Sequence, residues 1–277
     1  MEKKQHLVAL DLDGTLLTDD KRISERTKEI VQKTMAAGHI VVIATGRPHR
    51  ASIQYYETLE LNTPMINFNG AFIHHPRDEA WGVWHNPMPV ETARKIVEAA
   101  YAYNVHNIIA EVQDHVYLDK NDERIVEIFR STREDSPFTI GSLQHHLTTA
   151  PTSLLIHPRE NHAESLVYHL QKHYAEAIEQ RQWEAPWHII EIVKKGMNKA
   201  VGLQKIAHHY HIPQERIIAF GDEDNDLEMI DYAGVGVAMN NALNELKSIA
   251  DHITTSNEED GVGTFLEQYF NLDVKPV

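Results

Sequence analysis

Short apolar segments alternate with helix-like segments in the first part of the chain, and this alternation limits the fold more than any other feature. Leu7–Leu10, His39–Ala44 and Met65–Phe68 are short apolar runs of the kind that form buried strands. Helix-like segments lie between them, at Ser24–Ala37 and at about Arg50–Leu59. Strand–helix–strand units of this length predict a parallel sheet with right-handed crossovers.

The same alternation returns near the C-terminus. Helix-like and strand-like segments follow one another there, at Lys199–Tyr210 (helix), Ile217–Phe220 (strand), Leu227–Tyr232 (helix), Val235–Ala238 (strand) and Gly261–Phe270 (helix). Alternating segments of this kind are typical of one sheet with helices on both faces. We therefore predict an α/β core with a doubly wound, Rossmann-like parallel sheet, formed by residues 1–82 and 189–277.

The middle of the chain, residues 83–188, has a different pattern. A helix-like segment at Val90–Tyr103 precedes two strand candidates that can pair, His106–Val112 and His115–Leu118. Further elements are expected near Asp122–Thr132, Thr152–His157, Ala163–Tyr174, Ile178–Trp183 and Trp187–Val193. This mixture predicts an α+β domain inserted into the core.

The composition limits the class of protein and its partners. The 277 residues are 42% hydrophobic and 24% charged, as in an ordinary soluble protein, and no apolar run reaches the roughly 18 residues of a membrane helix. Nucleic acid is not an expected partner, because 26 basic and 41 acidic residues give a net charge of −15. The lack of cysteine excludes disulfides, cysteine-ligated zinc and a thiol nucleophile. With no apparent signal peptide, we expect a cytoplasmic protein without a membrane partner.

Two carboxylates stand at the end of the first predicted strand, in the segment Asp11-Leu12-Asp13-Gly14-Thr15. Residues i and i+2 of an extended chain point to the same side, so Asp11 and Asp13 can face one pocket. Two acids that close repel each other unless a cation or a retained proton separates them, and Mg²⁺ prefers oxygen ligands. Read alone, the segment indicates either a magnesium site or a turn rich in Asp and Gly.

Polar residues also follow two other predicted strands directly. Thr45 comes after the second strand, and Gly221-Asp222 comes after a strand in the C-terminal part. In open α/β sheets, ligands bind beyond the carboxyl ends of the strands. We therefore expect Asp11, Thr45 and Asp222 to share one rim of the core sheet.

Three further motifs follow the first along the chain: Ala44-Thr45-Gly46-Arg47, Lys195-Gly196-Met197-Asn198-Lys199 and Gly221-Asp222-Glu223-Asp224-Asn225-Asp226. In this order, the four motifs resemble the signatures of the haloacid dehalogenase-like superfamily, in its Cof-type phosphatase branch. The resemblance covers about residues 6–80 and 190–270. Asn240 departs from it, because the family more often has Gly there. Asn tolerates left-handed backbone, so we expect the fold to be unaffected.

The resemblance implies a role for each motif residue. Asp11 would attack phosphorus and form an aspartyl-phosphate, while Asp13 would act as general acid and then general base. Mg²⁺ would be held by Asp11, by the backbone carbonyl of Asp13 and by Asp222. The phosphoryl group would be held by Leu12, Thr45 (hydroxyl), Gly46 (backbone N–H), Lys199 and Asn225, with Asp226 orienting Lys199 or a metal-bound water.

The resemblance thus implies a Mg²⁺-dependent phosphatase of small phosphorylated metabolites, such as sugar phosphates or nucleotides. The inserted domain corresponds to a large cap of the C2 type, a lid whose residues would set the choice of substrate. The sequence identifies none of those residues and predicts no oligomeric state.

Other interpretations use the same residues. A phosphomutase would also need Asp11 and Asp13, but it would isomerise a sugar phosphate without releasing phosphate. A non-catalytic binding protein would not need a nucleophile next to an acid. Arg47 could contact the substrate or the inserted domain, or form a structural salt bridge. The histidine clusters, such as His208-His209-Tyr210-His211, fit a solvated surface better than a metal site.

Overall fold

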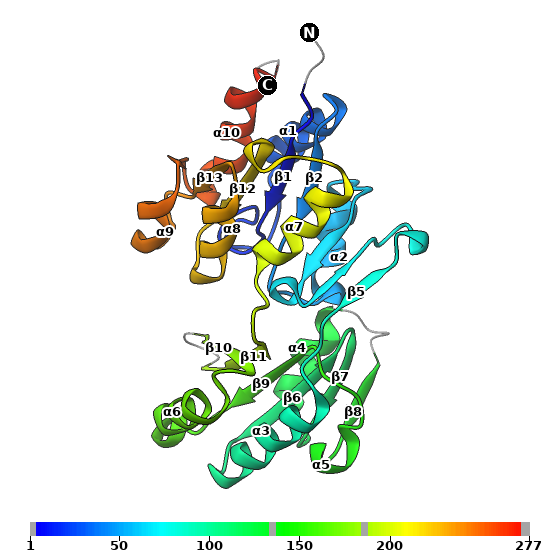
Figure 1. Cartoon of the computed structure of the whole chain (residues 1–277), viewed down its shortest axis with the longest axis vertical. Coiled ribbons are helices and arrows are strands. Elements are labelled where there is room, and N and C mark those ends of the chain that lie inside the picture. Colours follow the sequence, from blue (N-terminus) through cyan, green and yellow to red (C-terminus); the bar gives the residue numbers. More distant parts are fainter. Residues whose placement is uncertain (1–3, 133–136, 184–187, 273–277) are drawn as a thin grey trace. The chain divides into compact units, whose positions relative to one another are not determined.

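The structure is a computed structural model that describes residues 4–132, 137–183 and 188–272. The chain divides into two compact units (Figure 1). Unit 1 consists of Met1–Arg47, Ser52–Val83 and Asn198–Val277, and unit 2 of Pro48–Ala51 and Trp84–Met197. The predicted domain boundaries, after residues 82 and 188, stay a prediction.

The core of unit 1 is a five-stranded parallel sheet in the order β14-β13-β12-β1-β2. Its strands are β1 (Leu7–Leu10), β2 (Ile40–Ile43), β12 (Ile217–Gly221), β13 (Val235–Ala238) and β14 (His252–Ile253). Every residue of β1, β2 and β12 is buried, which explains why these strands are continuous apolar runs without alternation. The predicted doubly wound parallel sheet is therefore confirmed.

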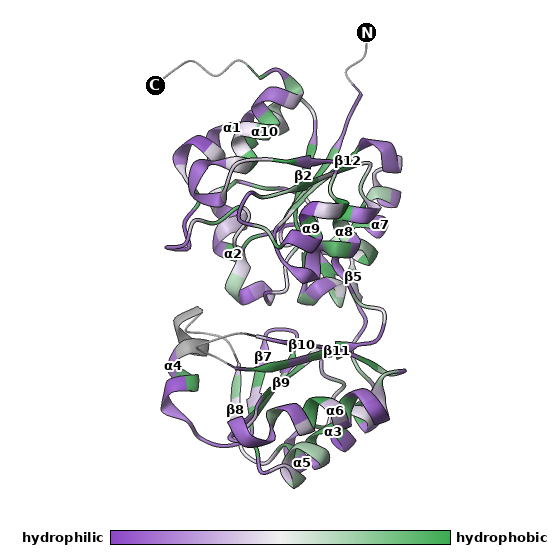
Figure 2. Cartoon of the chain, turned by 90° about the vertical axis from the view of Figure 1, so that its left-hand side faces the viewer, coloured by the Kyte–Doolittle hydropathy of each residue, from purple (hydrophilic) through white to green (hydrophobic). Residues whose placement is uncertain are grey.

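Helices cover both faces of this sheet (Figure 2). On one face lie α1 (Glu25–Ala36) and α10 (Gly261–Phe270), and on the other α7 (Lys199–His209) and α8 (Leu227–Tyr232). The first helix begins where the Ser24 side chain accepts a hydrogen bond from the Thr27 backbone N–H. Unit 1 also contains α9 (Asn244–Ile249) and most of α2 (His49–Thr58).

Short elements complete the part of the chain around residues 65–85. A small three-stranded sheet has the order β3-β4-β5, with β3 at Met65–Asn67, β4 at Phe72–His74 and β5 at Val83–His85.

Short 3₁₀ helices occur along the described chain, at Phe68–Gly70, Glu79–Trp81, Glu160–His162, Gln214–Arg216, Asp224–Asp226 and Asn257–Glu259.

Unit 2 contains a six-stranded sheet in the order β10-β11-β9-β6-β7-β8. Its strands are β6 (Asn107–Val112), β7 (His115–Leu118), β8 (Phe138–Ile140), β9 (Ser153–His157), β10 (Ile178–Gln182) and β11 (Ile190–Lys194). Its helices are α3 (Val90–Ala102), α4 (Glu123–Thr132), α5 (Leu143–His146) and α6 (Ala163–Tyr174). All the strand pairs are antiparallel except β7–β8.

The predicted elements agree with the observed ones to within a few residues. The bounds of β1, β7, β13, α6, α8 and α10 are those expected, whereas β4, β5, β8, β14, α5 and α9 were not expected. Strand β11 is observed at Ile190–Lys194 and pairs with β9 and β10, so it extends unit 2 beyond residue 188. It was expected at Trp187–Val193, and Trp187 lies outside the described residues.

Candidate active site

Three neighbouring strands carry the predicted site residues to one edge of the unit 1 sheet. Strand β1 lies between β2 and β12, and Leu10 is in register with Ile43 and with Phe220. Because the strands are parallel, the residues that follow them emerge on the same side. Asp11, Thr45 and Asp222 therefore meet at this edge, as the sequence pattern predicted.

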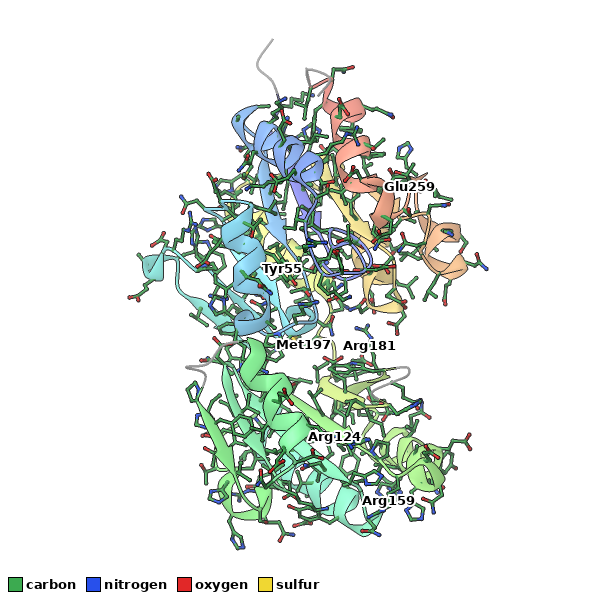
Figure 3. All side chains as sticks on the ribbon, turned by 180° about the vertical axis from the view of Figure 1, so that it is seen from behind. Tyr55, Arg124, Arg159, Arg181, Met197 and Glu259 are labelled. Carbon is green, nitrogen blue, oxygen red and sulfur yellow. The ribbon has the colours of Figure 1, made fainter. Side chains whose placement is uncertain are left out.

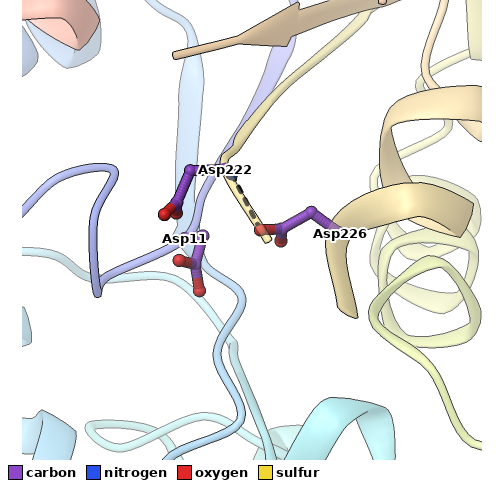
Figure 4. Close-up of side chains that lie close together, drawn as sticks. All are labelled: Asp11, Asp222 and Asp226. Atoms are coloured by element: carbon purple, nitrogen blue, oxygen red, sulfur yellow. Dashed lines mark hydrogen bonds between the residues drawn. The ribbon is translucent and has the colours of Figure 1, made fainter. Parts of the chain in front are cut away.

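The centre of the site is a cluster of three buried aspartates, Asp11, Asp222 and Asp226 (Figure 4). One carboxylate oxygen from each lies within 4.8 Å of the other two. Asp226 comes from the 3₁₀ turn that follows β12, where its Oδ2 accepts the backbone N–H groups of Asp222 (3.0 Å) and Glu223 (3.2 Å). These hydrogen bonds fix the loop that presents Asp222.

Lys199 is the only lysine that hydrogen-bonds to this cluster among the described residues. Its Nζ donates to Asp11 Oδ1 at 2.6 Å and to Asp226 Oδ1 at 2.7 Å, and its side chain is fully buried. It is the first residue of α7, whose start is capped by the Asn198 side chain on the Val201 N–H. Burial alone would lower the pKa of Lys199, but the charges of Asp11 and Asp226 outweigh it and raise that pKa.

The electrostatics of the cluster suit a divalent cation. Burial, opposed by the charge of Lys199, raises the pKa of Asp11 well above its ordinary value. Burial and then the charge of Asp226 raise the pKa of Asp222 to about 7. The cluster thus contains three carboxylates and one lysine, which contacts two of them, and a hard cation with oxygen ligands would supply the missing positive charge. The donor set therefore fits Mg²⁺, with Asp11 and Asp222 better available than Asp226, which already holds Lys199 and two backbone N–H groups.

The turn after β1 packs directly against Asp222. Thr15 Oγ1 donates to Asp222 Oδ1 at 2.7 Å, and Leu12, whose side chain is buried, accepts the Leu17 N–H at 2.8 Å. Gly14 has φ +72°, and a Cβ built on it would lie 2.1 Å from Asp222 Oδ2. Only glycine fits there, because both the left-handed backbone and the contact exclude a side chain.

The Asp13 carboxylate is bound by two cations. Arg47 binds both of its carboxylate oxygens, Nε to Oδ2 and Nη2 to Oδ1, each at 2.6 Å. Lys21 Nζ adds a third contact, at 2.8 Å. Burial would raise the pKa of Asp13, but Arg47 and then Lys21 outweigh it and lower that pKa to about 2. Arg47 thus forms an ion pair inside unit 1, and Asp13 is ionised at neutral pH.

Thr45, Gly46 and Asn225 gather around a residue that the sequence analysis did not single out, Asn69. Asn225 Nδ2 donates to Asn69 Oδ1 at 3.1 Å, and the Asn69 N–H donates to the Thr45 carbonyl at 3.2 Å. A Cβ on Gly46 would lie 3.2 Å from the Asn69 amide. Asn69 is buried with φ 50°, a left-handed conformation that Asn tolerates. The only sequence signal for it was a turn-forming Asn-Gly pair, which does not indicate a functional position by itself.

Six of the predicted residues therefore fall into two groups, and Asp13 lies apart from both, with Arg47 and Lys21. The structure brings Asp11, Lys199, Asp222 and Asp226 into contact, while Thr45 and Asn225 both hydrogen-bond to Asn69. Within the described residues, no histidine belongs to a group of three potential metal ligands. No helix in the described part of the chain is both long and apolar enough to cross a membrane.

Comparisons with known proteins place the chain in a family. The family model for haloacid dehalogenase-like hydrolases matches residues 8–266. A relative from Bacillus subtilis, the 5-amino-6-(5-phospho-D-ribitylamino)uracil phosphatase YitU, is 52% identical over 98% of this chain and 100% of its own. The pyridoxal phosphate phosphatase YbhA of Escherichia coli is 27% identical over 94% of this chain and 97% of its own.

Solved structures agree with this assignment. A haloacid dehalogenase-like hydrolase from Bacteroides thetaiotaomicron has a TM-score of 0.82 and 27% identity, and covers 96% of this chain and 100% of its own. The protein TM0651 from Thermotoga maritima has a TM-score of 0.83 and 27% identity, and covers 98% of this chain and 99% of its own. The chain therefore belongs to the haloacid dehalogenase-like hydrolases and is a phosphatase of that family.

Proposed function

We propose that the chain is a Mg²⁺-dependent phosphatase of small phosphorylated metabolites that works through an aspartyl-phosphate on Asp11. The observation that carries the proposal is the buried Asp11 carboxylate, held by Lys199 at 2.6 Å beside Asp222. A carboxylate that serves only as a surface charge needs no such support. Together with Lys199, a bound Mg²⁺ would supply the positive charge that a phosphoryl-transfer transition state needs, since its negative charge is spread over several oxygens.

The residues of unit 1 then have separate tasks. Lys199 holds one oxygen of Asp11 and thereby orients the carboxylate for in-line attack on phosphorus. Asp226, which contacts Lys199 on its other side, keeps the lysine in place. Asp11, Asp222 and the Asp13 carbonyl would hold Mg²⁺, whose chemistry here is to neutralise charge on the phosphoryl oxygens. Leu12, Thr45, Gly46 and Asn225 would bind those oxygens.

Asp13 is the proposed general acid and base. Ionised and oriented by Arg47 and Lys21, it can take the proton of the water that hydrolyses the aspartyl-phosphate. Donation to the leaving alcohol needs the protonated form, so Asp13 must loosen its contacts with Arg47 and Lys21 in that step. The two cations would therefore be part of the proton-transfer machinery.

The relative YitU suggests which ester to test first. It is 52% identical over its whole length, and its name gives 5-amino-6-(5-phospho-D-ribitylamino)uracil as its substrate. We propose the same aminouracil ester as a substrate here, with unit 2 as the cap that contacts the organic part and the cytoplasm as the location. The sequence analysis expected a small phosphorylated metabolite, such as a sugar phosphate or a nucleotide, and this proposal names one ester.

The test is phosphate release from this ester, from p-nitrophenyl phosphate and from a panel of sugar phosphates and nucleotides, with Mg²⁺ and with EDTA. We expect Asp11→Asn to abolish turnover and Asp13→Asn to reduce it strongly, by about 10²-fold or more, with folding intact. Full activity of Asp11→Asn would exclude it as the nucleophile. An isomerised sugar phosphate without free phosphate would favour the phosphomutase alternative instead.

A further inference from the structure

Helix α6 of unit 2 carries two histidines that the proposed phosphatase mechanism does not use. His169 and His173 are four residues apart on a helix that extends from Ala163 to Tyr174. Side chains at this spacing are neighbours on the surface of a helix. The two imidazole rings are in contact, with their centroids 4.5 Å apart and their planes inclined by 39°. Both residues belong to unit 2, so the pair needs no group from unit 1.

The histidine pair lies at the edge of the face that α6 buries. Leu166 and Leu170, the buried residues of this helix, each precede one of the two histidines by three residues. Three residues are slightly less than one helical turn, so the histidines run alongside the buried leucines. His169 is half-buried and His173 is exposed. An ion from solvent can therefore reach the pair while the helix stays packed on its core.

Both imidazole rings are available as ligands. Within the part of the chain that the structure describes, no hydrogen bond engages the ring of His169 or of His173. His39 differs in this respect, because its Nδ1 accepts the backbone N–H of His6 at 3.1 Å. Burial and then the charges of His173 and Lys172 lower the pKa of His169. A lower pKa favours the neutral ring, which is the form that binds metal ions.

Contacts near the start of α6 hold the His169 ring in place. The ring meets the edge of the Tyr103 ring, with 5.6 Å between the centroids. The Tyr103 carbonyl accepts a hydrogen bond from His162 Nδ1 at 2.8 Å, and the Asn104 carbonyl accepts one from Arg159 Nε, also at 2.8 Å (Figure 3). These bonds fix the turn after α3 against the residues just before α6. A ligand group that is oriented in advance loses less entropy on binding.

We propose that His169 and His173 together bind one divalent transition-metal ion, Zn²⁺, through one ring nitrogen each. Neutral imidazole suits Zn²⁺, Cu²⁺ and Ni²⁺, whereas Mg²⁺ prefers oxygen ligands. A Zn–N bond is about 2 Å long, so rings whose centroids are 4.5 Å apart can reach the same ion. Water molecules would complete the coordination shell.

The sequence of α6 indicates a binding site and not a second catalytic centre. Zinc hydrolases with two histidines at this spacing carry a glutamate directly after the first histidine, which acts as the general base. The corresponding residue here is Leu170, which is buried and cannot transfer a proton. The expected consequence of Zn²⁺ binding is therefore stabilisation of the helix that holds the ion.

The test is calorimetric titration of the full-length protein with Zn²⁺, in a large excess of Mg²⁺ that competes for the aspartate cluster. We expect one tight Zn²⁺ equivalent whose affinity falls by about tenfold or more in His169→Gln and in His173→Gln, because a single imidazole loses the gain from chelation. The double variant should bind no more weakly than either single variant. His106→Gln is the matched control, since His106 is exposed and its ring lies 4.9 Å from that of His157, and it should leave this affinity unchanged.

Three results would refute the inference. If His173→Gln binds Zn²⁺ as tightly as the wild type, α6 is not the site; this variant decides even if His169→Gln fails to fold, because His173 is exposed. If the losses of the two single variants add up in the double variant, the two histidines bind separate ions. If the wild type binds no Zn²⁺ in excess Mg²⁺, the pair is not a metal site. None of these measurements uses phosphatase activity, so the proposed function is tested independently.

Discussion

Replacement of Asp222 by Asn should stabilise the metal-free protein while it removes a ligand for Mg²⁺. Asp222 is 7% exposed and keeps its proton up to about pH 7 in the folded state, first because of burial and then because of the charge of Asp226. In the unfolded state the same group ionises near its ordinary value of 3.8. Between these two pH values the unfolded state binds fewer protons, so stability falls as the pH rises.

The size of the effect follows from the width of that interval. About three pH units, at about 1.4 kcal/mol each, give a penalty of about 4 kcal/mol above pH 7 that is absent below about pH 4. Asn has nearly the same shape, stays neutral, and can still accept the hydrogen bond of Thr15 through its amide oxygen. Metal-free Asp222→Asn should therefore be more stable than the wild type at pH 8, by up to about 4 kcal/mol, and equally stable near pH 4.

Urea unfolding in EDTA at pH 4, 6 and 8 measures this difference. A further series at pH 8 with saturating Mg²⁺ should narrow or reverse it, because only the wild type gains the full binding free energy of the metal. Thr18→Val is a suitable control, since this exposed hydroxyl contacts Asp20 and Arg22 and not the cluster. If Asp222→Asn is less stable than the wild type at pH 8 in EDTA, the assignment of an electrostatic penalty to Asp222 is wrong.

Three further substitutions test other parts of the site. Gly14→Ala should destabilise the protein by about 2 kcal/mol or more and weaken Mg²⁺ binding, because the new Cβ collides with the Asp222 carboxylate, as urea unfolding and metal titration would show. Lys199→Met should abolish turnover and destabilise the protein at pH 8 by about 3–5 kcal/mol, because it leaves the buried charges of Asp11 and Asp226 without a cation. A smaller loss of stability at pH 5, where the acids take up protons, would support the unpaired charges as the cause, and an equal loss would contradict it. Arg47→Gln should raise the pKa of Asp13 from about 2, as NMR titration of its carboxyl would detect. The stability that Asp13 contributes, about 1 kcal/mol after allowance for its exposure, is present above about pH 4 and lost toward pH 2, so variant and wild type should converge there.

The sequence predicted the core well where local pattern and tertiary environment agree. Strands β1, β2 and β12 are buried on both sides, so their apolar runs have no other interpretation at that length. A serine before a helix can accept a hydrogen bond from a backbone N–H of the first turn, and Ser24 does so from Thr27 at the start of α1. The acids after β1 and β12 could be placed on one rim because strand order and direction follow from the crossovers.

Residues whose role depends on unusual backbone could not be predicted in the same way. Asn69 and Lys21 both have positive φ, and their side chains reach the site only through the turns that this conformation creates. No periodicity reports such a turn in advance, since the left-handed conformation of a single residue leaves the apolar pattern unchanged. The short strands β4 and β8 were missed for a related reason, because three residues are too few to establish alternation.

The contacts of Asp13 differ from those expected from its spacing to Asp11. The motif places Asp13 two residues after Asp11, and extended backbone would point both carboxylates into one pocket. In the structure the backbone turns at Gly14, and Asp13 binds Arg47 and Lys21 while Asp11 binds Lys199. The two acids therefore meet opposite electrostatic conditions, which lower one pKa to about 2 and raise the other. In the metal-free protein these shifts oppose the proposed roles, because a nucleophile has to be ionised and a general acid has to be protonated. Bound Mg²⁺ next to Asp11 and release of Asp13 from its cations would reverse them, so it is the long-range contacts, not the spacing, that set the protonation of both acids.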